Sequence, residues 1–231
     1  MKKIEKEIFL NVMGCAGSGK GTLSKFITHN FSVLSIPTSR LLAEDGHLQK
    51  LRNGDLVNDV TVSHLVGRYI MQHREAGRFL GDGSIRSVGQ ANLIPRLLTE
   101  KFNFRTILTI NLECSREVAI HRMDRRELEE AGTRHEKNDQ VRIKRLDEYN
   151  KVSKQIKKVV SNYGPVIDVD ADKGIEDVVD FVTTVLGKFI DRDSNLIQCP
   201  KHGLIPKIPF LAGSRLTSMH VKSQDSAGLR K

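Results

Sequence analysis

One segment limits the choice of fold more than any other: residues 8–22, where an apolar run passes directly into a glycine-rich loop. The run IFLNVM is short and mostly apolar, as a buried parallel strand is. The loop reads GCAGSGKGT at 14–22, and after it Leu23, Phe26 and Ile27 recur at helical spacing. This order predicts a strand, a tight loop and a helix in direct succession.

Further apolar runs continue the alternation of strands and helices along the chain. Helical patterns separate these runs, and such an alternation predicts a parallel sheet that is covered by helices on both faces. We therefore expect an α/β fold of the P-loop type, with three layers in the order α/β/α and a five-stranded parallel sheet. The four further strands are expected at 31–36, 78–80, 106–112 and 165–169.

Two segments fall outside this alternation. Helical patterns at about 38–77 predict a helical insertion, and the short, charged stretch at about 125–139 predicts a second, smaller insertion. After residue 190 the periodicity is lost, and Pro, Gly, Ser and Lys accumulate. We expect one domain at 1–190 and a basic, flexible tail at 191–231.

The distribution of charge favours a local anion site. Residues 188–231 hold eight Lys or Arg against three Asp, a net charge of +5 out of the total of +9. In the remaining body, arginines cluster between residues 122 and 145, which favours a local site over a broad nucleic-acid surface. No apolar run reaches the roughly 18–20 residues of a transmembrane helix.

The N-terminus and the cysteines indicate a cytoplasmic protein. Glutamates interrupt the basic start of the chain, and the apolar stretch behind it is too short for a secretory signal. Cys15, Cys114 and Cys199 are far apart and lack the spacing of a disulfide framework or a zinc site. Cys15 is expected to be a small residue that fills the glycine-rich loop.

The glycine-rich loop satisfies the pattern GxxxxGK. Its glycines let backbone N–H groups surround phosphate oxygens, and the N-terminus of the following helix adds a favourable partial charge. Lys20 is placed to reach the outer phosphates of a nucleotide. Gly21 follows it, so the hydroxyl usual at that position is displaced to Thr22. The loop therefore predicts a nucleotide phosphate site.

Four motifs, in order, resemble those of nucleoside monophosphate kinases and of adenylate kinases in particular. The loop has the family's form GxxGxGKGT, and DGSIRSVGQA at 82–91 is similar to its pattern DGxPRxxxQA. The segments IPTSRLL at 36–42 and GDLV at 54–57 resemble the family's acceptor-binding insertion. The resemblance covers about residues 7–190, and it identifies the charged stretch as a lid of the short type.

This resemblance implies a reaction and its partners. Members of the family transfer a phosphoryl group from ATP, with Mg²⁺, to a nucleoside monophosphate, and we expect AMP to be the acceptor. Asp82 would organise water around the Mg²⁺, Arg86 would hold the acceptor phosphate, and Gln90 would read the acceptor base. We expect a monomer that binds no membrane.

The resemblance also assigns three overlapping sets of site residues. The catalytic set is Lys20, Arg86, Arg126, Arg134 and Arg145. The ATP-binding set is Gly17, Ser18, Gly19, Lys20, Gly21, Thr22, Arg122, Arg126 and Lys173. The acceptor-binding set is Thr38, Asp55, Leu56, Val57, Gly83, Arg86, Gln90, Arg134 and Arg145.

The acceptor segment departs from the family pattern. Family members usually carry Gly-Asp after the threonine and an arginine one turn later, whereas this chain has Ser39-Arg40 and then Ala43. Arg40 is one alternative source of the missing charge, and an acceptor other than AMP is another explanation. Ile85 replaces the usual proline of the second motif.

Two other functions stay open. The first is a P-loop kinase that phosphorylates a different small molecule. The second is an inactive relative that binds nucleotides or RNA, with RNA held through the basic tail at 191–231. A nucleic-acid partner is disfavoured by the clustered arginines, but the tail leaves it open.

Overall fold

The centre of the sheet is built from β1, whose seven residues are all buried and therefore need apolar or paired side chains on both faces. The structure is a computed structural model, and it describes residues 7–129 and 139–190. Its sheet has the order β2-β3-β1-β4-β5, with every neighbouring pair parallel. The strands are β1 (Ile8–Gly14), β2 (Leu34–Ile36), β3 (Arg78–Asp82), β4 (Thr106–Glu113) and β5 (Val166–Asp170).

The five expected strands and their parallel arrangement are confirmed, with one shortened strand. The run at 31–36 forms a strand only from Leu34 onward. Ser32 has a φ of 49°, which an extended strand cannot accommodate. Phe31 and Val33 are nevertheless buried in the core, so the apolar pattern of this run reports burial rather than strand structure.

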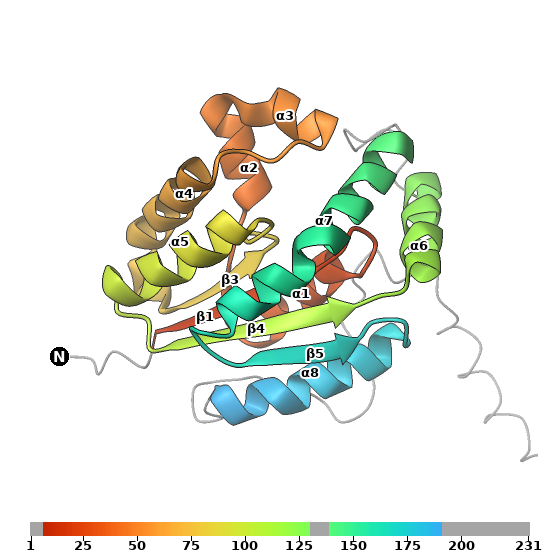
Figure 1. Ribbon diagram of the computed structural model, residues 1–231. Helices are drawn as coiled ribbons and strands as arrows, with labels where there is room; N and C mark the ends of the chain where they lie inside the picture. Colours follow the sequence, from red (N-terminus) through yellow and green to blue (C-terminus); the bar gives the residue numbers. More distant parts are fainter. Residues whose placement is uncertain (1–6, 130–138, 191–231) are drawn as a thin grey trace, which may run out of the picture. The chain divides into compact units, whose positions relative to one another are not determined.

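Helices cover both faces of the sheet, as Figure 1 shows. The helices α1 and α8 lie on one face, and α4, α5 and α7 lie on the other. The order α/β/α is therefore confirmed. The helices are α1 (Lys20–Asn30), α2 (Thr38–Leu42), α3 (Leu48–Asn53), α4 (Asp59–Gln72), α5 (Val88–Glu100), α6 (Arg116–Glu129), α7 (Asp139–Val160) and α8 (Ile175–Phe189).

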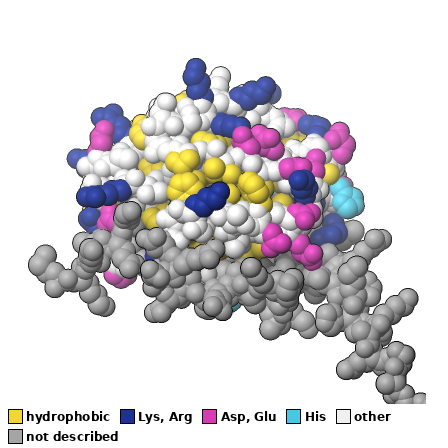
Figure 2. Space-filling model, turned by 90° about the horizontal axis from the view of Figure 1, so that it is seen from below, with side chains coloured by type: hydrophobic (Ala, Val, Ile, Leu, Met, Phe, Trp, Pro, Cys, Tyr) yellow, Lys and Arg dark blue, Asp and Glu magenta, His cyan; other side chains and the backbone are white. Residues whose placement is uncertain are grey.

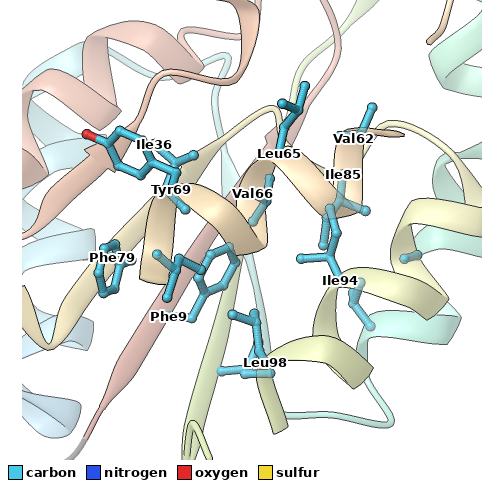
Figure 3. Packing of buried hydrophobic residues seen from close by; sticks show 14 of the residues in the cluster. Phe9, Ile36, Val62, Leu65, Val66, Tyr69, Phe79, Ile85, Ile94 and Leu98 are labelled. Atoms are coloured by element: carbon cyan, nitrogen blue, oxygen red, sulfur yellow. The ribbon is translucent and has the colours of Figure 1, made fainter. Parts of the chain in front are cut away.

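The core on the side of α4, α5 and α7 supports the expected insertion. Alternate residues of β1, Phe9 and Met13, point to this side, because successive side chains of a strand face opposite ways. Phe104 packs edge-to-face against Phe9, with ring centroids 6.4 Å apart. Figure 3 shows Val62, Leu65, Val66 and Tyr69 of α4 interleaved with Ile94 and Leu98 of α5 in this core.

The core on the other side supports the glycine-rich loop. Leu10 and Val12 of β1 are fully buried there, together with Leu23 and Ile27 of α1. Four residues of α8 complete this core: Val178, Val179, Val182 and Leu186. Each core therefore receives one set of alternating side chains from the same central strand.

The two segments outside the alternation have different outcomes. Between β2 and β3 the chain forms α2, a π-helical turn (Ala43–His47), α3, α4 and a 3₁₀ turn (Arg74–Ala76), which agrees with a helical insertion at 38–77. The stretch at 125–139 begins inside α6, and its remainder at 130–138 lies outside the described residues. The tail at 191–231 also lies outside them.

The described surface is mostly polar. Figure 2 shows the molecule from below the view of Figure 1, with a patch of apolar side chains surrounded by lysine, arginine, aspartate and glutamate. Phe181 of α8 has 47% of its surface exposed. Among the described residues, no helix is long and apolar enough to span a membrane.

The turn before β5 generates a stability prediction. A Cβ atom added at Gly164 would lie 1.9 Å from the backbone oxygen of Ile107 in β4, so the two strands would have to separate. Gly164→Ala is expected to lower the free energy of unfolding by about 1–3 kcal/mol in urea denaturation. Gly187→Ala is the control, because a Cβ there meets nothing within 4 Å and alanine favours α8. A Gly164→Ala protein as stable as Gly187→Ala would contradict this packing.

Candidate active site

The glycine-rich loop connects β1 to α1 at the carboxyl edge of the sheet, where β1 lies between β3 and β4. The crossover after β1 leads to β2 on one side, and the crossover after the neighbouring β4 leads to β5 on the other side. Open α/β sheets bind ligands where the connections of neighbouring strands diverge in this way. Gly17 and Gly19 have φ values of 82° and 91°, which glycine adopts without strain. A Cβ at Gly17 would lie 2.3 Å from the Ala119 carbonyl oxygen, so α6 fixes the loop from one side.

The other loop side chains fill the space under this turn. Cys15 is 3% exposed and packs with Ala119 of α6 and Leu146 of α7. Burial raises the pKa of its thiol. Ser18 is buried as well, with 2% of its surface exposed. The expected role of Cys15 as a small filling residue agrees with this burial.

Lys20 begins α1 and is held by the loop itself. Its Nζ donates to the carbonyl oxygens of Gly14, at 2.7 Å, and Cys15, at 2.6 Å. Burial and, to a smaller extent, the positive charge of Arg86 lower the pKa of Lys20 to about 8, while the Asp82 carboxylate opposes the shift. The ammonium group is thus held at the N-terminus of α1. An anion bound there would be stabilised by the charge of Lys20 and by the positive partial charge of the helix end.

Asp82 ends β3 beside the loop and is the residue that the sequence assigns to Mg²⁺. Its Oδ2 would lie 3.9 Å from a Cβ built on Gly21, which places the carboxylate at the start of α1. No group of three or more metal-ligating side chains occurs among residues 7–129 and 139–190. One carboxylate beside a phosphate loop fits Mg²⁺, which usually keeps water and takes further oxygens from substrate phosphates.

Seven of the nine residues of the acceptor-binding set line one pocket between the insertion and the loop after β3, whereas Arg145 does not line it and Arg134 lies outside the described residues. Arg86 carries a positive charge and Asp55 a negative charge among the described residues that line it. The hydroxyls of Thr38 and Ser84 meet at 2.8 Å in its floor. The lining residues are Thr38, Ser39, Leu42, Leu51, Asp55, Leu56, Val57, Val62, Gly83, Ser84, Arg86 and Gln90.

Arg86 and Gln90 are held by bonds within their own motif. The Arg86 Nε donates to the Gly83 carbonyl oxygen at 2.9 Å, and Gly83 needs its φ of 62° to make this turn. The backbone N–H of Arg86 donates to the Gln90 Oε1 at 2.7 Å. That bond uses one of the two lone pairs of the amide oxygen, so the Gln90 side chain keeps its NH₂ group and one further acceptor position for a ligand.

Arg122 connects α6 to the loop after β5. Its guanidinium donates to the carbonyl oxygens of Ala171, at 2.7 Å, and Lys173, at 3.3 Å. It therefore fixes the segment in which the sequence places the Lys173 carbonyl contact to the donor base. The two bonds fix the orientation of the guanidinium plane and the position of its charge.

Two of the other predicted arginines, Arg126 and Arg145, lie on α6 and α7. Arg126 is half-buried on α6. Arg145 of α7 does not line the acceptor pocket, and its Nη2 donates to the Leu51 carbonyl oxygen of the insertion. The nearby Lys144 pairs with Asp55 at 2.8 Å. Arg134 lies outside the described residues.

The missing acceptor arginine is not replaced inside the pocket. Arg40 does not line it, and its side chain is 67% exposed and pairs with Glu44 at 3.6 Å. Ala43 begins the π-helical turn and does not line the pocket either. Among the described residues, the positive charge of the pocket comes from Arg86 alone.

The motifs did not predict two buried residues in or near the site, Ser84 and Arg142. Ser84 is fully buried and completes the Thr38 contact, although its motif position is variable in the pattern DGxPRxxxQA. Arg142 is 9% exposed and donates to the Met123 carbonyl and the Asp124 carboxylate, which joins α7 to α6. Arg142 belongs to the arginine cluster at 122–145, but its charge alone does not predict that its side chain is buried.

The Arg122 bonds lead to a prediction about stability. Arg122→Met removes a charged donor from the partly buried carbonyl of Ala171 and the exposed carbonyl of Lys173, so the free energy of unfolding should fall by about 1.5–3 kcal/mol. Arg116→Met is the control on the same helix, because Arg116 pairs with Asp147 in an exposed salt bridge worth about 0–1 kcal/mol. Urea denaturation of both variants measures the difference, and equal losses would contradict the assigned role.

Comparison with known proteins identifies the family. A family model described as adenylate kinase matches residues 12–174. An adenylate kinase of Bartonella tribocorum is 30% identical over 180 residues, which cover 72% of this chain and 93% of the relative. Adenylate kinases of Bartonella bacilliformis and Sinorhizobium medicae are each 28% identical, and cover 76% and 75% of this chain and 97% of each relative. The chain therefore belongs to the adenylate kinase family and is a nucleoside monophosphate kinase.

Proposed function

We propose that the enzyme transfers the γ-phosphoryl group of ATP to AMP and forms two molecules of ADP. The observation that carries this proposal is the pocket that brings Thr38, Arg86 and Gln90 together beside the glycine-rich loop. Its hydroxyl and amide groups suit the edge of an adenine base, and its arginine suits a phosphate. The adenylate kinases among its relatives support the same acceptor.

The donor half of the site would hold ATP by its phosphates. The N–H groups of Gly17 to Gly21 would surround the phosphate oxygens, with the Lys20 ammonium and the Thr22 hydroxyl as further ligands. Arg122 would support the donor base together with the carbonyl of Lys173. Bound Mg²⁺ would neutralise phosphate charge, with Asp82 holding it through water.

Charge neutralisation would come from arginine side chains at the junction of the two substrates. Arg126, Arg134 and Arg145 are proposed to bind the transferred group, and Arg86 to bind the acceptor phosphate. Phosphoryl transfer spreads negative charge over equatorial oxygens, so positioned guanidinium groups lower the barrier without a covalent intermediate. We expect the enzyme to act as a monomer.

The departures from the family's acceptor motif at Ala43 and Arg40 affect the expected affinity for AMP. With Arg86 as the positive charge among the described lining residues, and Asp55 opposing it, the pocket holds an acceptor phosphate less strongly than two arginines would. We therefore expect AMP to be the acceptor with a raised KM. The residues that would read the base are in place, so selectivity should persist while affinity falls.

An acceptor panel tests this proposal. Purified protein with ATP and Mg²⁺ is offered AMP, GMP, CMP, UMP and dTMP, and diphosphate formation is followed in a coupled assay. Selective formation of ADP from AMP is the expected result, and it should be lost in Lys20→Ala. Efficient phosphorylation of another monophosphate with none of AMP would overturn the choice of acceptor. Consumption of ATP with a non-nucleotide alcohol alone would favour a different P-loop kinase.

The lowered pKa of Lys20 predicts how ATP affinity depends on pH. A phosphate ligand favours the protonated ammonium, so ATP should raise the pKa from about 8 in the free enzyme. Affinity should then be constant below this value and fall by up to about tenfold per pH unit above it. Titration calorimetry between about pH 7 and about pH 9.5 measures the change.

The control for this titration is Lys20→Arg. Arginine stays protonated throughout the range, so its ATP affinity should vary little with pH even if it is weaker overall. An equally steep loss in both proteins would assign the dependence to another group.

A further inference from the structure

The N-terminus of α5 receives a carboxylate from a different helix. Asp59 lies in the first turn of α4, within the acceptor-binding insertion. Its Oδ1 accepts a hydrogen bond from the Ser87 hydroxyl at 2.5 Å. Ser87 is the residue that precedes α5, so the negative charge lies where the helix has unpaired N–H groups and a positive partial charge.

Gly89 makes this approach possible. A Cβ atom built on Gly89 would lie 1.9 Å from the Asp59 Oδ2 and 2.7 Å from its Cγ. No side chain fits there while the carboxylate keeps its place. The backbone of Gly89 does not have a positive φ, so its conformation does not require glycine. Glycine is needed at this position because it leaves space for the Asp59 side chain.

The contact continues to two residues of the acceptor pocket. The Ser87 hydroxyl oxygen accepts from the backbone N–H of Gln90 at 3.0 Å, which caps α5. The Gln90 side-chain oxygen accepts in turn from the backbone N–H of Arg86 at 2.7 Å. Asp59 itself is absent from the residues that line the pocket.

The direction of these bonds follows from the hydroxyl group. A serine hydroxyl has one proton. Ser87 donates it in the hydrogen bond to Asp59, because an ionised carboxylate can only accept hydrogen bonds. The oxygen is then left to accept from Gln90. Without Asp59 the hydroxyl proton could turn elsewhere, and the position of Ser87 would depend on the cap alone.

We propose that Asp59 is a positioning residue for the acceptor site, which acts through Ser87 to fix Gln90 and Arg86. The inference rests on the proposed function, since it assumes that these two residues bind the acceptor. Because Asp59 belongs to the insertion and Ser87 to the loop after β3, their bond also holds the two walls of the pocket in one register.

Kinetics of single substitutions test the proposal. Ser87→Ala and Asp59→Ala should each raise the KM for the acceptor about tenfold, because Gln90 and Arg86 would no longer be held in place for the acceptor. The KM for ATP should stay within about twofold, and Ser87→Thr, which keeps the hydroxyl, should restore the acceptor KM. The acceptor used is the monophosphate that the panel finds best.

Asn58→Ala is the matched control. Asn58 precedes Asp59, and its side chain caps α4 by accepting from the Val60 N–H at 2.9 Å. Removing it should lower stability without raising the acceptor KM. A rise in the acceptor KM as large as that of Ser87→Ala would reduce the role of Asp59 to general stability of the insertion, and the proposal would fail.

A double-mutant cycle gives a second, sharper test. Gly89→Ala should raise the acceptor KM because its methyl group displaces the Asp59 carboxylate. In an Asp59→Ala background the same change should add less than about twofold, since the collision is gone. Equal effects in the two backgrounds would contradict the proposal.

Amide hydrogen exchange separates this inference from the choice of substrate. In the free protein, Asp59→Ala should speed exchange of the Gln90 N–H, whereas Asn58→Ala should leave it unchanged. If this occurs but no monophosphate accepts phosphate, the proposed function fails and the positioning contact stands. Unchanged exchange at Gln90 in Asp59→Ala would overturn the contact itself.

Discussion

The parallel pairing of β1 with β3 on one side and β4 on the other determines where the functional side chains lie. It brings the ends of three strands, at Gly14, Asp82 and Glu113, to one edge of the sheet although they are far apart in the sequence. The glycine-rich loop then starts from a strand that is buried. The same register places the Asp82 carboxylate beside Gly21, close enough for its charge to act on Lys20.

Around this edge, backbone carbonyls hold the arginines and the lysine as much as carboxylates do. Lys20 is bound by loop carbonyls, Arg86 by Gly83, and Arg122 by the segment after β5. A carbonyl fixes a cation without cancelling its charge, which leaves a positive site for phosphate. Carboxylates pair instead with two cations that are not assigned to bind phosphate, since Asp55 meets Lys144 and Asp124 meets Arg142.

The sequence predicted the fold and most of the pocket because strong local patterns specify them. Alternating apolar runs predicted the strands, and the three acceptor motifs at 36–42, 54–57 and 82–91 together predicted seven of the twelve residues that line the pocket. It did not predict where the strand before Leu34 breaks, since the conformation of Ser32 depends on its surroundings. It also missed Ser84 and Arg142, whose roles come from contacts with residues far away in the chain, and it carried no sign that Asp59 meets Ser87.

The two cores on opposite faces of the sheet have a consequence for how such an enzyme can evolve. The elements that form the acceptor pocket, α2, α4 and α5, rest on one core, while α1 and α8 rest on the other. Mutations that repack the first core can reshape the acceptor pocket while the glycine-rich loop keeps its support from the second. A lineage can therefore change the molecule that it phosphorylates and retain its donor, with intermediates that still fold.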